Sequence, residues 1–359
     1  MKGRTWHTVV ALVAGVTISL SACAGDQGTD TDSFTVGLLL PSRFIPRWEQ
    51  SDKPLIEQHV KKLCPRCTTK YANAENDAST QRQQMVSMIT NGAKVIILDT
   101  ADTKALRSSI QEARNEGVPV VAYDRLAEGP VSAYVSFDGV KVGRLQGQAL
   151  LTAMGDTAGQ KNIVMMNGDP TSPNAPSYRK GALSVLEGRT KIARSYDIQG
   201  WNTMNAHADM VGAIAALGPD RIGGVLAAND SIAEGVISAL KGAGVRKLPP
   251  VTGQDADLDA VQRIVKGEQY MTVYKPFASE AATAAAMAVA LGRGEDLGDI
   301  ATTTTDSPTT QRIPSVLLTP TAVTAATIGR TLVKDGVYTV DQICTPDLRP
   351  ACDKIGLTR

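Results

Sequence analysis

The feature that most constrains the fold is a regular alternation of short apolar runs with longer amphipathic runs. The short runs are rich in aliphatic and β-branched residues, and the longer runs repeat their apolar residues at helical spacing. We predict strands over 34–40, 70–72, 95–98, 118–123 and 133–136, and helices over 48–63, 79–91 and 103–116. This strand-and-helix repeat predicts a parallel sheet covered by helices on both faces.

The same pattern starts again in the second half of the chain. We predict strands over 163–166, 194–197, 224–227, 250–252, 270–273 and 314–318, and helices over 178–187, 231–243 and 280–292. A chain of 359 residues is also too long for one compact core. We therefore predict an α/β fold of two doubly wound, Rossmann-like lobes joined by a hinge that the chain crosses more than once. Ligands bind such sheets beyond the carboxyl ends of the strands.

The N-terminus has the features of an export signal. Lys2 and Arg4 precede an apolar run over 9–20, which is too short to remain as a membrane span, and Leu-Ser-Ala leads directly into Cys23. Small residues followed by cysteine resemble the lipobox of bacterial lipoproteins, which implies that Cys23 carries a lipid anchor on the outer face of the cell membrane. The alternative is an ordinary signal peptide with a chance cysteine. Residues 24–33 are polar and turn-rich, as expected of a flexible tether.

The charge balance excludes some classes of partner. The chain has 37 basic and 36 acidic residues, and no basic stripe that would bind nucleic acid. The apolar stretch over 277–291 carries Glu280, so we expect no transmembrane helix after the signal. We expect membrane contact only through the lipid anchor, a monomeric state, and no metal or cofactor.

Four cysteines follow Cys23, and in an exported protein two disulfides are the default. Of the three possible pairings we favour Cys64 with Cys67 and Cys344 with Cys352. A thioredoxin-like redox centre at Cys-Pro-Arg-Cys is the rival interpretation, but this motif follows a predicted helix instead of opening one. A zinc site is disfavoured because the chain has no second Cys-x-x-Cys.

Polar residues with complementary hydrogen-bonding chemistry follow several predicted strands. Carboxylates accept hydrogen bonds from neighbouring hydroxyls, whereas Arg, Lys and Asn side chains donate to ring and hydroxyl oxygens. This set of groups fits a neutral, hydroxyl-rich ligand. The residues concerned are Arg47, Asp124, Arg125, Asn174, Asn229, Asp230, Asp255 and Lys275.

Two tryptophans remain after the signal, Trp48 and Trp201, and both lie in predicted loops or at a helix start. An indole face offers a flat apolar surface to the C–H groups of a sugar, so that two such faces would hold a pyranose between them. The alternative for each is an anchor that packs a helix onto its sheet.

In order, these segments resemble the xylose-binding members of the periplasmic sugar-binding family of ABC transporters, over nearly the whole mature chain. The most specific motifs are Gly-Gln-Asp-Ala-Asp-Leu over 253–258 and Met-Thr-Val-Tyr-Lys-Pro over 271–276. The other matching segments are 47–48, 122–125, 135–138, 141–143, 174–175, 200–201, 228–230 and 317–320.

The resemblance implies a type I periplasmic binding protein fold, a bound pentose such as xylose or a sugar alcohol, and delivery to an ABC permease with its ATPase. It implies that a sugar contacted by both lobes shifts an open form toward a closed one. It also implies one lobe over 34–137 and 277–312, and another over 138–276 and 313–359. The implied sugar-bonding residues are Arg47, Asp124, Arg125, Asn174, Asn229, Asp255 and Lys275, with Trp48 and Trp201 stacking on the ring.

Several of these residues have structural alternatives. Asp138 and Asp257 directly precede helical runs and are expected to be helix N-caps, while Asp230 is as consistent with capping as with binding. Asp255 and Lys275 could form a structural ion pair.

The chain also departs from its relatives in two loops that bear on which sugar binds. Pro173 stands where relatives often have asparagine, and the segment 41–46 is unlike theirs, with Arg43 as a further donor at the pocket edge. Another pentose, an aldohexose and a linear sugar alcohol therefore stay open.

Three rival functions differ in kind. A hydrolase needs a nucleophile with a base, but His59 and His207 both lie in predicted helices and no Gly-x-Ser-x-Gly occurs. Glycoside cleavage by paired carboxylates is disfavoured because Asp124 and Asp255, beside cations, should be poor general acids. A transcription regulator on the same fold would need a DNA-binding helical module. A sugar sensor that presents its ligand to a receptor or kinase stays open.

Overall fold

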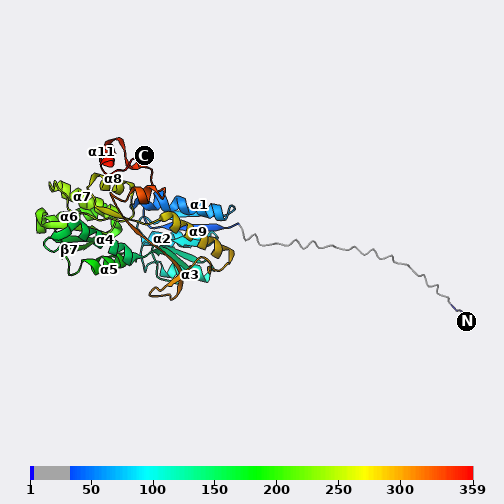
Figure 1. Ribbon diagram of the computed structural model, residues 1–359. Helices are drawn as coiled ribbons and strands as arrows, with labels where there is room; N and C mark the ends of the chain where they lie inside the picture. The colour runs from blue at the N-terminus through cyan, green and yellow to red at the C-terminus, as the bar shows by residue number, and fades with distance from the viewer. Residues whose placement is uncertain (4–32, 359) are drawn as a thin grey trace. The chain divides into compact units, whose positions relative to one another are not determined.

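A computed structural model describes residues 1–3 and 33–358 of the chain. Strands and helices alternate along it as predicted, and both lobes are α/β (Figure 1). The export signal, Cys23 and nearly all of the tether lie outside the described residues. Within the described residues, no helix is long and apolar enough to cross a membrane.

The first lobe is built on a seven-stranded sheet with the order β10-β11-β5-β4-β3-β1-β2. All neighbouring strands are parallel except β10, which pairs antiparallel with β11. The strands are β1 (Thr35–Leu40), β2 (Thr68–Asn73), β3 (Ala93–Leu98), β4 (Val120–Tyr123), β5 (Ala133–Phe137), β10 (Thr303–Thr305) and β11 (Ile313–Leu318).

Helices cover both faces of this sheet because its central strands are apolar on both sides. Leu38 and Leu40 of β1 belong to the buried cluster that includes α1 (Lys53–Leu63) and α9 (Phe277–Arg293). Leu39 points the other way, into a cluster with α2 (Ala78–Thr90) and α3 (Arg107–Asn115). This alternation with a period of two confirms the predicted two-sided burial.

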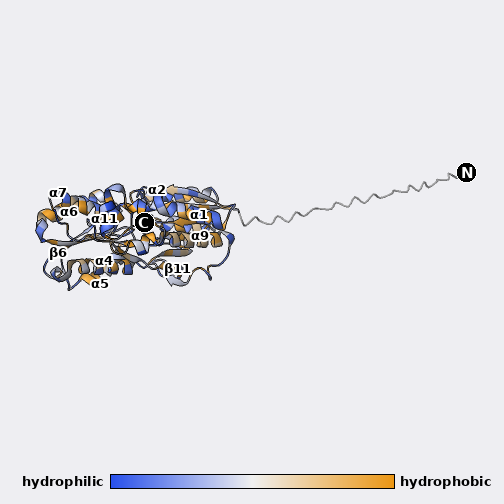
Figure 2. Ribbon diagram, turned by 45° about the horizontal axis from the view of Figure 1, so that its top comes forward, coloured by the Kyte–Doolittle hydropathy of each residue, from blue (hydrophilic) through white to orange (hydrophobic). Residues whose placement is uncertain are grey.

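The second lobe has a parallel sheet with the order β7-β6-β8. Its two faces are covered by two helix pairs, which show both hydrophilic and hydrophobic colouring, as amphipathic helices do (Figure 2). The elements are α4 (Gly139–Met154), β6 (Asn162–Asn167), α5 (Ala175–Leu186), β7 (Lys191–Asp197), α6 (Thr203–Leu217), β8 (Ile222–Ala227) and α7 (Asp230–Gly242). The predicted strand over 250–252 is reduced to a single bridge between Val225 and Val251.

Helices α4 and α5 approach each other closely enough to require glycine. A Cβ on Gly143 would lie 1.8 Å from the carbonyl oxygen of Tyr178, and one on Gly181 would lie 2.0 Å from that of Val140. This contact fixes the start of α5, which carries Asn174 and Tyr178.

The C-terminal part of the chain packs on α8 (Leu258–Lys266) through a small apolar cluster. It contains β12 (Thr321–Thr324), which pairs antiparallel with β9 (Met271–Tyr274), followed by α10 (Val340–Ile343) and α11 (Arg349–Lys354). The structure has disulfides between Cys64 and Cys67 and between Cys344 and Cys352, the pairing that we favoured.

We predicted that the last second-lobe segment begins at Ile313, but the structure places that residue in the first lobe. Strand β11 extends the first sheet, with Ser315 beside Tyr134 and Leu318 beside Phe137 of β5, and Ile313 is buried with the first-lobe core. The next strand to pair in the second lobe is β12. The chain therefore leaves the first sheet only after Leu318, where the parallel pairing of β11 with β5 ends.

Candidate functional site

All nine residues that we predicted to bind ligand line one small cavity. Two segments of the first lobe and several of the second contribute to it, although the residues are spread over more than half of the chain. The first lobe supplies Arg47, Trp48, Asp124 and Arg125; the second lobe and its crossing segment supply Asn174, Trp201, Asn229, Asp255 and Lys275.

The backbone at the site adopts conformations that most residues avoid. Asp124, Trp201 and Asp255 have φ values of 54°, 53° and 98°, in the left-handed region. Such conformations are sparsely populated, above all for a bulky residue such as tryptophan, and they cluster at functional sites. Each one turns a side chain inward directly after a strand or a tight turn.

Arg47 is the centre of the first-lobe charges and is 1% exposed. Its guanidinium donates to both carboxylate oxygens of Asp52, at 3.0 and 2.7 Å, to Glu280 at 3.1 Å and to Asp124 at 2.9 Å. A π-helix over Trp48–Asp52 brings Asp52 back to Arg47, five residues earlier. The guanidinium also lies 4.0 Å from the ring centroids of both Trp48 and Phe277, a distance suited to cation–π attraction.

Hydrogen bonds and ion pairs also join the two lobes across the cavity. The amide nitrogen of Asn174 donates to Asp124 Oδ1 at 2.7 Å, and Lys275 Nζ lies 3.3 Å from Asp124 Oδ2. Lys275 Nζ is also 3.0 Å from Asp255 Oδ1, so the ion pair that we considered as an alternative for these two residues is present. Asp255 Oδ1 lies 3.5 Å from Arg47 as well.

These contacts set the protonation of the central carboxylate. Burial by itself raises the pKa of the Asp124 carboxyl, but Lys275, Arg47 and Arg125 outweigh burial and hold that pKa below its usual range. Asp124 is therefore a hydrogen-bond acceptor and a poor general acid, as predicted. Behind it, burial and the nearby Asp124 raise the pKa of Glu280, although Arg47 opposes the shift.

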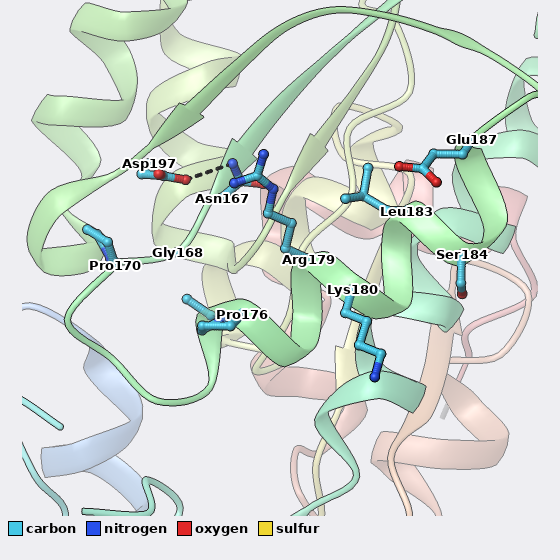
Figure 3. Close-up of a pocket in the computed structure, with 11 residues that line it drawn as sticks. Asn167, Gly168, Pro170, Pro176, Arg179, Lys180, Leu183, Ser184, Glu187 and Asp197 are labelled. Carbon is cyan, nitrogen blue, oxygen red and sulfur yellow. Dashed lines mark hydrogen bonds between the residues drawn. The ribbon is translucent and has the colours of Figure 1, made fainter. Parts of the chain in front are cut away.

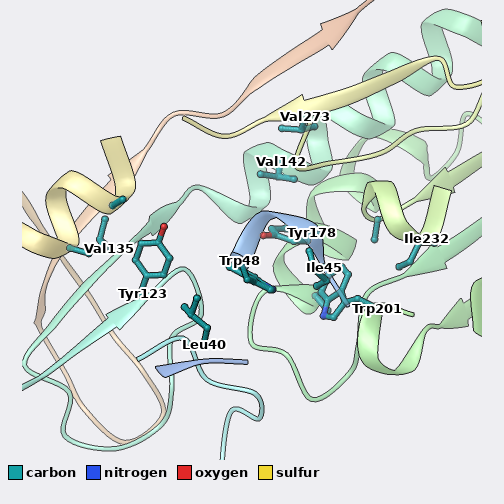
Figure 4. Close-up of a cluster of buried hydrophobic side chains, with 14 of the residues drawn as sticks. Leu40, Ile45, Trp48, Tyr123, Val135, Val142, Tyr178, Trp201, Ile232 and Val273 are labelled. Atoms are coloured by element: carbon teal, nitrogen blue, oxygen red, sulfur yellow. The ribbon is translucent and has the colours of Figure 1, made fainter. Parts of the chain in front are cut away.

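Two tryptophans line the cavity and carry unused hydrogen-bonding capacity. Trp48 and Trp201 lie close together with Ile45 and Tyr178 (Figure 4). The ring of Tyr178 meets Trp201 edge-on, with centroids 6.2 Å apart. The indole Nε1 atoms of both tryptophans are buried and have no hydrogen-bond partner among the described residues. Since buried donors are almost always paired, these two point to a partner that the chain itself does not supply.

Three residues of the cavity were missed by the sequence analysis. Ile45, Tyr178 and Gln254 line it together with the predicted nine, and Gln254 Oε1 is buried without a partner in the described part of the chain. Gln254 lies inside the Gly-Gln-Asp-Ala-Asp motif and could have been found there. Ile45 and Tyr178 had no signal, because an apolar loop residue and a helix tyrosine are ordinary core residues.

The structure also separates caps from cavity residues. Asp138 caps α4 by accepting from the amide of Lys141 at 2.9 Å, as predicted, whereas Asp257 precedes α8 without a side-chain cap bond. Asn229 both lines the cavity and caps α7, through the amide of Ile232 at 3.0 Å. Asp230 takes neither expected role, because its carboxylate is buried against Gln269 and Thr272.

Arg43 is not at the cavity. Its guanidinium is more than half exposed and pairs with Glu49 and Glu75 on the surface. We expected Arg43 to be a further donor at the pocket edge. It does not line the cavity, and its guanidinium is already paired with these two carboxylates.

A larger groove lies on the second lobe alone, with a volume of about 590 Å³. In Figure 3 the side chain of Arg179 reaches toward Asn167 and Asp197 at the ends of β6 and β7, and Lys180 points away. None of the nine predicted residues lines this groove. The smaller cavity differs from this groove because residues of both lobes line it and all nine predicted residues are among them.

Comparison with known proteins agrees with this geometry. Residues 36–296 match the periplasmic binding protein domain family. The D-xylose-binding periplasmic protein of Escherichia coli is 35% identical over 309 residues, which cover 84% of this chain and 90% of that protein. The multiple sugar-binding periplasmic receptor ChvE of Rhizobium radiobacter is 31% identical, with 94% and 99% covered.

Among solved structures, an ABC transporter solute binding protein from Clostridium phytofermentans with bound β-D-glucose superposes with a TM-score of 0.79 at 29% identity. The match covers 86% of this chain and 99% of that one. Because the family match spans most of the chain and the relatives are covered almost end to end, this chain belongs to the periplasmic binding protein family and has its type I fold.

Proposed function

We propose that this protein is the solute-binding component of an ABC importer and that it captures a neutral monosaccharide or sugar alcohol between its lobes. The observation that carries the proposal is the central cavity itself. Donors and acceptors from both lobes line it together with two indoles whose Nε1 atoms lack partners among the described residues. Hydroxyl groups of a sugar would supply those partners.

A neutral ligand follows from the charges. Each charged side chain that lines the cavity has an opposite charge within 4 Å: Arg47 has Asp124, Lys275 has Asp255, and Arg125 has Asp99 at 3.6 Å. A charged ligand would break these pairs and leave a buried charge without compensation, which is costly. A hydroxyl can bond to either member of a pair without removing the other.

The mechanism is opening and closing about the crossing segments. The cavity has a volume of about 20 Å³, on the order of one water molecule. A sugar therefore enters only when the lobes separate, and it then takes over hydrogen bonds that Asn174 and Lys275 make to Asp124. Because sugar contacts both halves, it binds the closed form more tightly and shifts the population toward it.

The ligand class is tested by a thermal-shift and calorimetric screen of pentoses, hexoses and sugar alcohols, with uronic acids and amino sugars as charged counterparts. We expect a neutral member to raise the melting temperature and its charged counterpart to fail. Stabilisation by none of the neutral compounds would overturn the sugar assignment. For substitutions of cavity carboxylates such as Asp255, the control variant is Asp259→Asn, since Asp259 is exposed on α8 and lies outside the cavity.

Delivery to a permease and lipid anchoring at Cys23 are parts of the same proposal. Uptake of the labelled sugar should be lost when the gene is deleted and restored by the intact gene. Restored uptake by a chain with Asp255→Ala would argue against transport through this site. Replacing Cys23 by alanine should release the protein from the membrane fraction, and retention there would contradict lipid anchoring.

A further inference from the structure

A second cavity lies between the lobes, beside the crossing segments, and has a volume of about 700 Å³. We call it the hinge-side cavity. The first lobe contributes the loops 102–104 and 305–308, and the second lobe contributes the loop 170–174 and the starts of α4 and α5. Asn174 lines both this cavity and the central one, so the two adjoin at that side chain.

Hydrogen bonds between the lobes close the hinge-side cavity at one border. The amide and the hydroxyl of Thr103 both donate to the carbonyl oxygen of Thr171, at 3.0 and 2.6 Å. The crossing segment from Phe137 to Val140 also lines this cavity. Because residues of both lobes line it, a molecule that fills the cavity contacts both lobes.

Two residues that line this cavity carry a hydroxyl group without a hydrogen-bond partner in the described part of the chain. Ser172 is 1% exposed, yet its hydroxyl has no hydrogen-bond partner within the described residues, and the same is true of the Thr305 hydroxyl. Both residues line the cavity, one from each lobe. A buried hydroxyl without a partner costs free energy, so two of them on the lining residues of one cavity favour a ligand that can bond to them.

The remaining lining disfavours an anion and offers apolar faces to a ring. Asp102, Asp138 and Asp306 already accept hydrogen bonds from backbone amides, at 2.8, 2.9 and 2.8 Å. Their three carboxylates oppose an anion, with exposed Lys104 as the cation of the lining. The apolar part of the wall is formed by Tyr134, Phe137, Leu126, Leu317 and four prolines, which offer flat or smooth faces.

We propose that the hinge-side cavity is a second binding site for a neutral hydroxylated ring. The ring could come from either of two sources: the second ring of a saccharide whose first ring occupies the central cavity, or a separate sugar or polyol molecule. The first source rests on the proposed function, because it needs a sugar in the central cavity. The second does not.

The test compares calorimetric titrations of D-glucose, D-xylose and xylitol with titrations of the disaccharides cellobiose and maltose. Leu317→Trp narrows the hinge-side cavity, and since Leu317 is 44% exposed the larger side chain should be tolerated. Val211→Trp is the matched control, because Val211 is an exposed apolar residue of α6, 47% exposed, outside both cavities. Ser172→Ala removes only the unpartnered hydroxyl.

If the second ring is part of a disaccharide, Leu317→Trp weakens disaccharide binding at least tenfold and leaves monosaccharide binding unchanged. If it is a separate molecule, the native chain binds two monosaccharides or polyols, and Leu317→Trp binds one. In either case Ser172→Ala weakens the same event about 2- to 10-fold, as expected for one hydrogen bond, without lowering the melting temperature. Val211→Trp behaves like the native chain.

One monosaccharide per chain, no disaccharide binding and no effect of Leu317→Trp would overturn the inference. Asp255→Ala separates this failure from failure of the proposed function. If a single binding event is lost in Asp255→Ala and kept in Leu317→Trp, the proposed function stands and the second site falls. If no compound binds at all, both fall. Binding that survives Asp255→Ala but not Leu317→Trp supports the second site alone.

Discussion

The two halves of the central cavity are built differently. In the first lobe, Arg47 is held by Asp52 and Glu280 from its own lobe, and Tyr123 donates to Asp52 behind it. In the second lobe, Asn174 and Lys275 make their bonds to Asp124 across the cavity. When the lobes separate, Arg47 keeps Asp52, Glu280 and Asp124, whereas Asn174 and Lys275 lose Asp124.

This difference provides a way to couple closure to ligand binding. A preorganised first half reduces the ordering cost of binding, whereas a second half with partners across the cleft adds its bonds only on closing. Substitutions behind Arg47 should therefore change mainly folding stability, and substitutions in the second half should change mainly affinity.

The largest effect is expected from Asp52→Ala. It removes the two-point partner of a buried guanidinium, and breaking a buried pair costs about 3–5 kcal/mol. Urea denaturation measures the loss. The control is Glu57→Ala on α1, which removes a surface partner of Lys53 and should cost less than about 0.5 kcal/mol. Equal stability of the two variants would show that the first half is not a preorganised network.

The next effect is on affinity. Asp255→Ala should weaken binding of the identified sugar at least about 100-fold, about 2.8 kcal/mol, because it removes a buried acceptor for sugar hydroxyls. Lys275 still has Asp124 as an ion-pair partner, 3.3 Å away, so the free energy of unfolding should fall less than in Asp52→Ala. Calorimetry and denaturation of the same sample check both values. Unchanged affinity would remove Asp255 from the site.

Within the first half, folding shifts the pKa values of Asp124 and Glu280 in opposite directions. The pKa of Asp124 is lowered on folding, so its ionised form stabilises the fold above about pH 4 and this stability is lost on further acidification. The pKa of Glu280 is raised, so its contribution is present at low pH and is lost as the pH rises above about 4.3.

Denaturation across pH 2–8 tests these opposite signs, within a limit of about 1.4 kcal/mol per pH unit for one proton. Asp124→Asn should flatten the acid side of the profile, and Glu280→Gln should flatten the decline above pH 4.3. Identical profiles for both variants would contradict the assignment of opposite shifts.

The smallest effect concerns a bond at the rim between the lobes. The amide of Asn76 donates to the carbonyl oxygen of Gly200 at 3.2 Å, next to Trp201. Asn76→Gly should reduce affinity about 2- to 5-fold through faster release, since an exposed hydrogen bond contributes about 1 kcal/mol or less. Glycine is chosen because Asn76 has a φ of 63°, where alanine would be strained, so the change in unfolding should be small. Stopped-flow fluorescence of the tryptophans measures the release rate. A slower release would contradict a role in holding the closed form.

Much of the fold could be predicted, because it depends on periodicity. Residues such as Leu38, Leu39 and Leu40 alternate between the two faces of β1, and this pattern is visible in the sequence. Two details could not be predicted: that the strand over 250–252 is reduced to one bridge, and that Ile313 belongs to the first sheet. Pairing with Val225 or with β5 is a long-range contact that no local pattern encodes.

The periodicity of the sequence was enough to predict two α/β lobes. Of three possible cysteine pairings the sequence favoured the observed one, and the resemblance to the xylose-binding proteins implied the nine side chains that meet at one cavity. Packing brings Ile45 and Tyr178 into the cavity, buries Asp230 elsewhere and holds Trp201 in a left-handed backbone conformation, and none of these could be read from the sequence. The tertiary structure also revealed the hinge-side cavity, with the unpartnered hydroxyls of Ser172 and Thr305. Those features depend on distances between segments far apart in the chain, which packing sets and composition does not.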